Sequence, residues 1–391
     1  MGTVTSATPV AVLYIHNSAQ IAGGNRALLG LFDHLNRDRF RPVSVLPTNG
    51  PMQDELRARG VPHVVVPLEA ALVGSPLRAL QLIWRLSGLY RREGIRLLHA
   101  NDGLCYRHAS IAARMAGIRR ICHLQFPPDH RTLTWALKVR PDVLITCSKH
   151  MGRQLHDARL ACLQSVPIVA VENAVDTMRY RPPQDVGQLR RSLEIEVTSQ
   201  IVTIVGSISE RKGHRDFLDA ARLILARRPR TLFLVLGDDL EGNGAYRLVM
   251  EEHARTCGIA DRVRFLGFRT DTADWIAASD VIVLPSLKEG LPLSLAEAHG
   301  CAKPVVATRI DGIPEIVEDG VSGFLFEPHD VEGMSAAITR LLEDDSRRLE
   351  MGAAGRHRAE RIFSQRAHAA KVQQVYERLL GGTVSSSTAS S

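Results

Sequence analysis

Long apolar stretches are missing from this chain of 391 residues. No run of apolar side chains reaches the roughly 18 residues that a membrane-spanning helix needs. The first residues carry no basic segment ahead of the first apolar run, so we expect no signal peptide. Together these absences predict a cytoplasmic protein.

Cysteine is also scarce, and its spacing argues against a cysteine-rich site. No two cysteines form a C-x-x-C pair, so we expect neither a disulfide framework nor a zinc site, and we interpret the side chains as reduced thiols. The six cysteines are Cys105, Cys122, Cys147, Cys162, Cys257 and Cys301.

Acidic residues are few in the first half of the chain. Lys and Arg outnumber Asp and Glu by 21 to 11 in residues 1–172, and the whole chain has a net charge of +7. Such asymmetry predicts an anionic partner for the first half. Aromatic residues make up only 5% of the sequence, and no helix-turn-helix, zinc-finger or RNP pattern is present, so nucleic acid is not expected. An anionic membrane surface or a phosphate-bearing acceptor fits better.

Short apolar runs and helical patterns alternate along the chain. The runs at 10–15, 43–46 and 64–66 predict strands, and a helical pattern lies at 52–59. This alternation is typical of a doubly wound α/β sheet, and the length suffices for two such domains.

The segment 76–94 combines apolar residues at roughly helical spacing with four arginines. A basic amphipathic helix of this type can lie on anionic lipid, or it can pack on the sheet as an ordinary surface helix. The arginines are Arg78, Arg85, Arg91 and Arg92.

The sequence is organised around residues 281–306. The apolar run 281–284 predicts a buried strand, and a loop carrying Glu289, a helix at about 293–299 and a second strand at 304–307 follow it. Ligands of parallel sheets bind at the carboxyl ends of strands, where a helix start favours an anion. We therefore expect an anion site beside this loop.

Two carboxylates, Glu289 and Glu297, flank the predicted helix start. On one continuous helix their offset would separate them by about 12 Å along the axis. They are therefore suited to opposite ends of an elongated ligand. The alternative is that Glu289 is a solvated loop charge and Glu297 an ordinary surface residue.

Three motifs follow one another in this region. The string E-G-L-P-L-S-L-A-E-A-H-G-C-A-K-P-V-V-A-T at 289–308, G-I-P-E-I-V at 312–317 and D-G-V-S-G-F-L-F at 319–326 resemble those of glycosyltransferase family 4. Members of this family are retaining, nucleotide-sugar-dependent (group 1) transferases of GT-B fold. The resemblance implies an α/β protein with two Rossmann-like, doubly wound parallel-sheet domains that face each other across a cleft.

The resemblance also implies domain boundaries. We expect an acceptor-side domain at 1–173 and a nucleotide-sugar-binding domain at 186–364. A helix at 365–380 is expected to cross back to the first domain, and the polar tail at 381–391 should be disordered.

A donor site in the second domain is implied by individual residues. Lys212 resembles the family's phosphate-binding lysine, whereas Ser207 stands where the family has an arginine, so Arg211 is the expected second cation. Two fixed cations suit a diphosphate, because charge-assisted contacts are the strong ones. Glu289 is expected to bind hydroxyls of the sugar, and Glu297 those of the ribose.

Further donor contacts are expected at two glycine-containing loops and at the central helix start. Residues 267–269 resemble the loop that holds the nucleotide base. The residues expected to contact the donor in the two loops and at the helix start are Gly206, Ser207, Gly267, Phe268, Arg269, Gly290, Leu291, Pro292 and Leu293.

In the first domain, Gly23 and Gly24 match the family's glycine pair, which we expect in a loop before a helix at about 27–35. Many members place a histidine close to the donor sugar after a later strand. Gln125 occupies that position here, and His123 lies two residues earlier on the same strand face. Both side chains are candidates for this contact.

The resemblance implies a retaining glycosyltransferase that moves a sugar from a UDP- or GDP-sugar to a glycan, lipid-linked or small-molecule acceptor. No cofactor and no metal are expected, and the sequence contains no D-x-D motif. The alternatives are a nucleotide-sugar hydrolase or epimerase on the same fold, and a non-catalytic nucleotide-sugar-binding protein. The expected location is the cytoplasm, with peripheral attachment to the inner membrane face as a further expectation from the basic first half.

Overall fold

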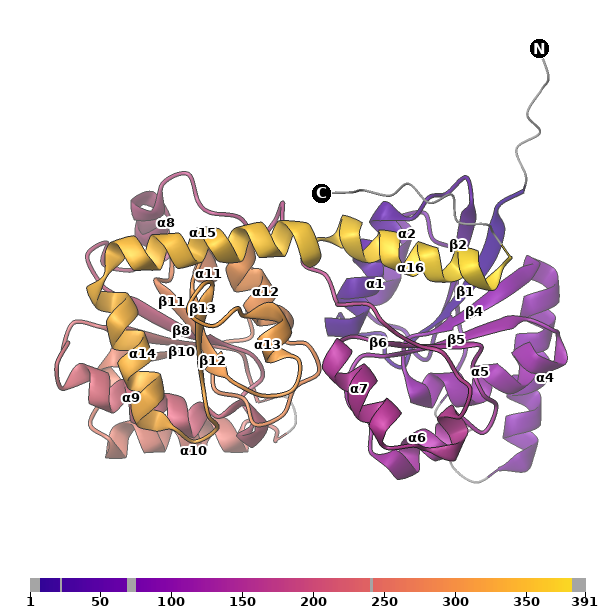
Figure 1. Ribbon diagram of the computed structural model, residues 1–391, viewed down its shortest axis with the longest axis horizontal. Helices are drawn as coiled ribbons and strands as arrows, with labels where there is room; N and C mark the ends of the chain where they lie inside the picture. Colours follow the sequence, from indigo (N-terminus) through magenta and orange to yellow (C-terminus); the bar gives the residue numbers. More distant parts are fainter. Residues whose placement is uncertain (1–7, 22, 69–74, 240–241, 382–391) are drawn as a thin grey trace, which may run out of the picture. The chain divides into compact units, whose positions relative to one another are not determined.

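The computed structural model describes residues 8–21, 23–68, 75–239 and 242–381 of the chain. They form two compact units (Figure 1). Unit 1 combines residues 1–173 with 365–391, and unit 2 is the continuous segment 174–364. The tail for which we predicted disorder lies outside the described residues beyond Gly381.

Unit 1 contains a sheet of seven parallel strands in the order β3-β2-β1-β4-β5-β6-β7. Helices α1, α2 and α16 cover one face, and α4 and α5 cover the other (Figure 1). The strands are β1 (Val10–Ile15), β2 (Phe40–Leu46), β3 (His63–Val65), β4 (Ile95–Ala100), β5 (Arg119–Leu124), β6 (Val143–Thr146) and β7 (Ile168–Ala170). The helices are α1 (Gly23–His34), α2 (Met52–Ala58), α4 (Pro76–Glu93), α5 (Gly103–Met115), α6 (His130–Ala136), α7 (Lys149–Asp157) and α16 (Gln365–Leu379).

Unit 2 contains a parallel sheet of six strands in the order β10-β9-β8-β11-β12-β13. The strands are β8 (Ile201–Val205), β9 (Leu232–Leu236), β10 (Val263–Gly267), β11 (Val281–Leu284), β12 (Val305–Thr308) and β13 (Gly323–Phe326). The helices are α8 (Val186–Ser192), α9 (His214–Leu225), α10 (Ala245–Thr256), α11 (Thr272–Ala278), α12 (Leu293–Gly300), α13 (Ile313–Ile316), α14 (Val331–Glu343) and α15 (Asp345–Ile362).

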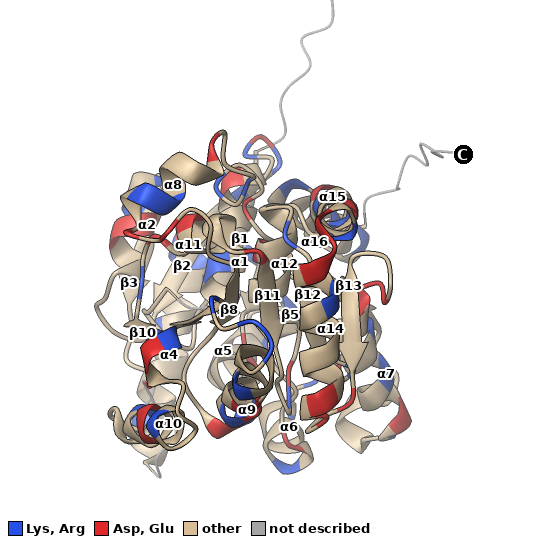
Figure 2. Ribbon diagram, turned by 90° about the vertical axis from the view of Figure 1, so that its left-hand side faces the viewer, with Lys and Arg blue, Asp and Glu red and all other residues tan. Residues whose placement is uncertain are grey.

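Both sheets have the strand order of dinucleotide-binding folds, in which the chain starts in the middle and winds first one way and then the other. The predicted fold class of two doubly wound parallel sheets is therefore confirmed. Parallel strands covered on both faces are apolar throughout. Figure 2 accordingly shows charged residues on the helices of unit 2, whereas strands β8, β11 and β12 carry none.

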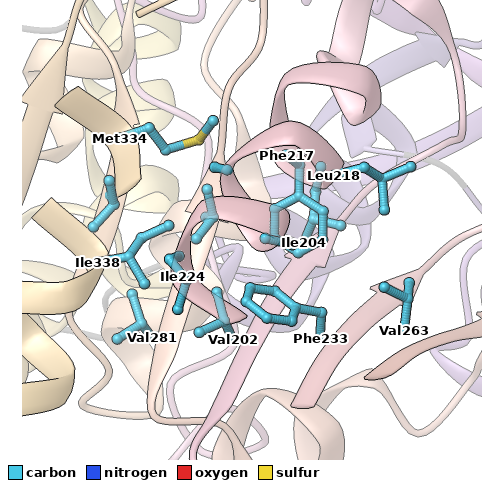
Figure 3. Packing of buried hydrophobic residues seen from close by; sticks show 14 of the residues in the cluster. Val202, Ile204, Phe217, Leu218, Ile224, Phe233, Val263, Val281, Met334 and Ile338 are labelled. Atoms are coloured by element: carbon cyan, nitrogen blue, oxygen red, sulfur yellow. The ribbon is translucent and has the colours of Figure 1, made fainter. Parts of the chain in front are cut away.

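The core of unit 2 lies between its sheet and helices α9, α10 and α14. Figure 3 shows the side chains of α9 directed toward those of β8 and β9. Phe217 of α9 meets Phe233 of β9 edge to face, with ring centroids 5.8 Å apart. Burying one such ring contributes about 1.5–3 kcal/mol. Helix α9 is thereby held on the sheet directly after the loop that contains Lys212.

The last helix, α16, belongs to unit 1, where it packs against α1 (Figure 1). Its Tyr376 is fully buried and donates a hydrogen bond to the hydroxyl of Tyr14 in β1 (3.0 Å). Its Lys371 donates to the carboxylate of Glu172 (2.5 Å). Polar contacts and apolar burial together therefore attach the end of the chain to the first sheet.

Helix α4 packs on the sheet, as one of the two interpretations of segment 76–94 expects, but it has apolar residues on its outer face as well. Its inner face packs on the sheet through Leu82, Leu86, Leu89 and Tyr90. The apolar residues Leu77, Leu80 and Trp84 lie instead on the outer face, where they are 72%, 62% and 75% exposed. The apolar residues of this segment are thus divided between two faces.

No helix among the described residues combines the length and the apolar character that crossing a lipid bilayer requires.

Candidate functional site

Two loops of unit 2 leave the sheet where its winding direction changes. Strands β8 and β11 are parallel neighbours in the sheet, although they are far apart in sequence. The loop at 206–213 follows β8, and the loop at 285–292 follows β11. The chain turns away in opposite directions at such a position, which leaves a crevice outside the strand ends. The expected donor residues at Gly206, Ser207, Arg211, Lys212 and 289–293 all lie on these two loops or at the helix start that follows.

A glycine brings the two loops into contact. Gly213 has φ +69°, and a Cβ atom at this position would lie 2.0 Å from the carbonyl oxygen of Pro285. Only glycine therefore fits both the backbone conformation and the close approach. The N–H of Leu287 donates to the carbonyl of Arg211 (2.8 Å), which fixes the loops side by side.

Lys212 and Glu289 form the centre of this site. Lys212 Nζ donates to Glu289 Oε1 (2.5 Å), and Ser286 Oγ donates to the same oxygen (2.6 Å). The lysine and glutamate side chains retain only 12% and 6% of their exposure. The structure thus pairs two residues that are 77 positions apart and that we expected to contact different parts of the ligand.

Arg211 lies on the same side of this pair. Its Nη1 is 3.8 Å from Glu289 Oε1 and donates to the carbonyl of Lys288 (3.3 Å). Its side chain is a third exposed, so it can reach a ligand from the solvent side. Two cations are therefore held within one short turn, as a diphosphate requires.

Sequence reasoning assigned no role to Ser286 or Asp311. Asp311 Oδ2 accepts from the backbone N–H of Glu289 (2.8 Å), and it has φ +45°, which Asp tolerates better than most residues. Ser286 stands three residues before Glu289, a spacing that allows a local side-chain contact, and this was the only sequence signal for its role. Both residues orient Glu289.

Burial decides between the two interpretations of the carboxylates. Glu289 is 4% exposed and Glu297 is 6% exposed, so the alternative of a solvated loop charge and an ordinary surface residue is wrong. A carboxylate is almost never buried without a polar or charged partner. Glu297 lies in α12, and Glu289 lies in the loop before that helix.

The start of α12 is an anion-binding feature in its own right. Pro292 is the N-cap residue and Leu293 the first helical residue, while Gly290 and Leu291 are buried just before them. The first N–H groups of any helix have no intrahelical acceptor, and the helix dipole is positive there. Pro292 itself has no N–H, so within 291–293 only Leu291 and Leu293 have a backbone donor.

The loop expected to hold a nucleotide base follows β10. Gly267 has φ +68°, and Phe268 is 63% exposed. Arg269 makes a two-pronged contact with Asp271, through Nε to Oδ1 (2.8 Å) and Nη2 to Oδ2 (2.5 Å). Its guanidinium also lies over the ring of Trp275, 5.5 Å from the centroid. Phe268 is therefore the accessible aromatic face of this loop, and Arg269 is locked in place.

The loop after β8 contains the remaining expected donor residues. Lys212 packs on Gly206, since a Cβ atom there would lie 3.4 Å from Lys212 Cε. Ser207 is half-buried. His214, which sequence reasoning did not select, is buried at the start of α9, and burial lowers its pKa to about 4.

Unit 1 brings Gly24 and Gln125 together at the carboxyl ends of β1, β4 and β5. A Cβ atom on Gly24 would lie 2.8 Å from Gln125 Cγ. Gln125 Nε2 donates to Asn101 Oδ1 (2.8 Å), whereas its own Oε1 is buried and has no donor facing it among the described residues. The expected loop position of the glycine pair is wrong, because α1 already begins at Gly23.

His123 lies in the core of unit 1. It is fully buried and shares a hydrogen bond with His99 Nε2 through its Nδ1 (3.1 Å). His99 Nδ1 in turn contacts the Tyr376 hydroxyl (2.6 Å), and His123 stacks on His368. Burial lowers the pKa of His123 well below its ordinary value, so its imidazole is neutral at pH 7.

The arrangement in unit 2 can bind a ligand with an anionic centre and hydroxyl groups. Lys212, Arg211 and the start of α12 supply fixed positive charge, and the buried carboxylates of Glu289 and Glu297 can accept hydrogen bonds from hydroxyls. Such charge acts most strongly where water is excluded.

Two protein-family models match the chain. The model for glycosyl transferases group 1 matches residues 185–358, and the model for glycosyltransferase family 4 matches residues 21–179. Together they cover most of both units.

Curated relatives agree with these models. The lipopolysaccharide core biosynthesis mannosyltransferase LpsB of Rhizobium meliloti is 29% identical over 57% of this chain and 64% of its own length. An Escherichia coli UDP-Gal:alpha-D-GlcNAc-diphosphoundecaprenol alpha-1,3-galactosyltransferase is 24% identical over 86% of this chain and 88% of its own length.

Solved structures resemble the whole fold. HepE of Anabaena in complex with UDP has a TM-score of 0.82 at 22% identity and covers 94% of this chain and 100% of its own. A sucrose-phosphate synthase of Thermosynechococcus elongatus has a TM-score of 0.77 at 19% identity and covers 96% of this chain and 100% of its own.

Proposed function

This chain belongs to the family 4 (group 1) glycosyltransferases, and we propose that it moves a sugar from a UDP- or GDP-sugar to a glycan, lipid-linked or small-molecule acceptor with retention of anomeric configuration. One observation carries the proposal. Lys212 contacts Glu289, although the two residues are 77 positions apart in sequence. The contact lies where the winding direction of the unit 2 sheet changes, in the loop that leads into α12. A cation, a carboxylate and a helix start at one point suit the junction of a diphosphate and a sugar.

We assign the donor contacts of unit 2 as follows. Lys212 and Arg211 bind the diphosphate together with the N–H groups at the start of α12. Glu289 accepts hydrogen bonds from the sugar, and Glu297 accepts them from the ribose. The loop with Gly267, Phe268 and Arg269 holds the base. Strand β10 lies two strands from β8, about 10 Å away across the sheet, and this separation suits an elongated ligand.

The chemical step breaks the bond between the anomeric carbon and the diphosphate oxygen. Negative charge develops on the departing diphosphate, so cations and helix N–H groups aimed at it stabilise the transition state more than the ground state. A diphosphate oxygen takes the proton of the acceptor hydroxyl, and the acceptor oxygen bonds the same face of the sugar. We propose that Lys212 and Arg211 supply the charge without a metal ion.

In unit 1, we assign Gly24 and Gln125 to contacts with the transferred sugar. The absence of a side chain at Gly24 lets Gln125 lie close to the start of α1. The unpartnered Oε1 of Gln125 can accept a hydrogen bond from a hydroxyl. Between the two candidates in this segment we favour Gln125, because His123 is fully buried in a histidine and tyrosine network.

We propose a lipid-linked or polysaccharide acceptor at an anionic membrane surface. The outer face of α4 presents Leu77, Leu80 and Trp84, which lie within about one-sixth of a helical turn of one another. Arg78 and Arg85 are exposed beside them. Exposed apolar residues with flanking arginines suit the interface of an anionic bilayer. The name of the E. coli relative specifies a diphosphoundecaprenol-linked acceptor, which supports this choice.

Purified protein incubated with labelled UDP- and GDP-sugars, with and without lipid-linked and glycan acceptors, tests the proposal. We expect nucleotide release only when an acceptor is present, and NMR of the product should show the donor's anomeric configuration. Turnover without an acceptor would instead identify a hydrolase or epimerase. Binding without turnover would identify a non-catalytic nucleotide-sugar-binding protein.

The same assay tests the role of metal ions. We expect EDTA to cause no loss of transfer that magnesium or manganese restores, because protein cations carry the diphosphate charge. A loss that magnesium or manganese restores would overturn this part of the proposal.

A further inference from the structure

Three potential metal ligands meet on the helical side of unit 2, outside the donor site. Asp219 lies in α9, His253 lies in the last turn of α10, and Cys257 caps the end of α10. Their ligand atoms lie within 4.8 Å of one another. Cys257 is also the one cysteine among those described that is partly exposed to solvent rather than buried. Sequence spacing alone gave no reason to group these residues.

The distances among the three atoms are close to those of a metal site. Cys257 Sγ lies 3.7 Å from His253 Nε2 and 3.9 Å from Asp219 Oδ1, and the latter two atoms are 2.7 Å apart. A tetrahedral zinc ion with ordinary bond lengths separates such ligand atoms by about 3.3–3.6 Å. The two sulfur distances need to shorten only slightly, and the oxygen and nitrogen need to separate by about 0.6 Å.

Helix geometry presents two of the ligands together. His253 and Cys257 are four residues apart, and the N–H of Cys257 still donates to the carbonyl of His253 (2.9 Å), so the helical conformation reaches both. Side chains at this spacing lie on one face of a helix. Both also lie at the carboxyl end of α10, where the helix dipole favours a cation.

A catalytic relay or an activated thiol does not explain the cluster. In a Cys-His-Asp relay the thiol and the carboxylate contact opposite nitrogens of the imidazole. Here both contact Nε2 of His253, so the three groups converge on one point. Burial and the charge of Asp219 raise the pKa of the Cys257 thiol, which is the reverse of activation for nucleophilic attack.

We propose that Asp219, His253 and Cys257 bind one zinc ion, with water as the fourth ligand. One carboxylate, one imidazole and one thiolate form a donor set that zinc accepts. Closed structural zinc sites have four protein ligands, whereas water fills the fourth position here, and the effect that we assign to the ion is to link two helices. The ion joins α9 to α10, and α9 begins directly after Lys212 and Gly213, so the site steadies the helix that carries the proposed phosphate loop. Asp219 lies five residues beyond His214, the first residue of α9, or about 7.5 Å along the helix axis, and Lys212 lies before this helix, so the ion is not a donor ligand.

Metal content and cobalt spectroscopy of the full-length protein test the proposal. After removal of metals with a chelator and dialysis against a zinc buffer, we expect one zinc ion per chain. Replacing zinc with cobalt should give the absorption of a tetrahedral site, including a sulfur-to-cobalt charge-transfer band. Cys257→Ser should abolish that band, and Asp219→Asn should reduce zinc content at least tenfold.

The matched control is His329→Gln. His329 forms a similar pair with Asp216 of helix α9 (3.0 Å), but no cysteine of the described part of the chain joins this pair in a metal-binding group. This variant should keep full zinc content and the cobalt band. Equal zinc content in the wild type and in Cys257→Ser, or a cobalt spectrum without sulfur ligation, would overturn the proposal.

Thermal unfolding provides a second measurement that does not depend on sugar transfer. With free zinc at 100 times its Kd, we expect Tm to rise by about 5–10 °C for a unit of this size. Cys257→Ser should remove the zinc-dependent rise, even if it changes the Tm of the metal-free protein. An equal rise in this variant would contradict the assignment.

Discussion

Lys212, which we propose to bind the donor diphosphate, is already paired with an anion in the structure. Glu289 and Ser286 hold the ammonium group in one place, and both partners are largely buried. A charge that is fixed and desolvated before the donor arrives needs little reorganisation during the reaction. The pair therefore positions the cation, and in the proposed mechanism the donor diphosphate replaces Glu289 as the negative partner of Lys212.

Lys212→Gln should lower kcat by about 10²- to 10³-fold, the usual loss when one preorganised transition-state contact is removed. The side chain keeps a similar length and a hydrogen-bond donor for Glu289, so far-UV circular dichroism should remain unchanged. Steady-state nucleotide release measures the effect. Lys288→Gln, an exposed residue of the same neighbourhood, should retain full activity. Equal activity of the Lys212 variant and the wild type would remove Lys212 from the mechanism.

Gly24→Ala should lower kcat/KM by about 3- to 10-fold, because the added methyl group displaces the Gln125 side chain from its place. Gln125→Ala should give a similar loss. In the double variant the Gly24 change should have no further effect, since the displaced group is already absent. Additive losses would show that Gly24 acts independently of Gln125.

Residue types at this site could be predicted from the sequence, but the contact between them could not. The motif at 289–308 and the Arg211–Lys212 pair indicated a donor site. That Lys212 contacts Glu289 depends on β8 and β11 being neighbours, which only the sheet order establishes. Asp311 could not be found because its role depends on a contact with a backbone N–H 22 positions away.

At the scale of elements, the apolar run at 281–284 predicted its strand correctly, whereas residue propensities placed the start of helix α1 too late. The predicted strand at 281–284 is β11, and the predicted helix at 293–299 is α12 with one further residue. Helix α1 begins four residues earlier than predicted, because a glycine pair favours a turn by propensity alone. Contact of Gly24 with Gln125 is tertiary information that the local sequence does not contain.

Helix α4 should attach the protein to anionic vesicles. Leu80→Gln combined with Trp84→Gln should lower vesicle binding at least about tenfold, because two large exposed side chains no longer enter the interface. Arg78→Gln with Arg85→Gln should mainly reduce the salt-sensitive part of binding. Co-sedimentation with vesicles that contain anionic lipid measures both effects. Leu349→Gln, an equally exposed leucine of unit 2, is the control. Equal vesicle binding by all variants would exclude α4 as the membrane-binding element.

Acid should destabilise unit 1 through its buried histidines. Burial lowers the pKa of His16 and His368 to about 4 and that of His99 to about 3. These pKa values lie below the ordinary value of 6.5, so the folded unit holds the histidines in their neutral form. The stability of unit 1 is therefore highest above pH 6.5 and falls as the pH drops from 6.5 toward 4. At pH 5 a single histidine whose pKa in the folded state is about 4 lowers the unfolding free energy by roughly 2 kcal/mol.

Urea unfolding of a Trp275→Phe variant, whose remaining tryptophans lie in unit 1, measures this pH dependence. His368→Gln in that background should flatten the change in stability between pH 7 and 5. His156→Gln, at an exposed histidine, should not. If the unfolding free energies of both variants change equally between pH 7 and 5, the buried histidine network does not control acid stability.

At the scale of the whole molecule, the chain enters unit 2 once and leaves it once at neighbouring positions. Val175 and Ser364 form a bridge, and the N–H of Val175 donates to the carbonyl of Phe363 (2.7 Å). Length and alternating elements predicted two domains. Length and alternation could not predict the residue at which unit 2 begins, because this residue depends on tertiary contacts. In the structure the contacts of unit 2 begin at Ala174.

Nucleotide binding should therefore stabilise the two units unequally. Every residue that we assign to the nucleotide lies in unit 2, so UDP at 100 times its Kd should add about 2.7 kcal/mol to the unfolding free energy of that unit alone. A variant with Trp84→Phe and Trp135→Phe reports unit 2 through Trp275, and Trp275→Phe reports unit 1. Urea titrations with and without UDP should shift only the midpoint of the first variant, and Lys212→Gln should reduce that shift. A shift confined to unit 1 would place the nucleotide on the other sheet, and equal shifts would mean that both units contribute to its binding.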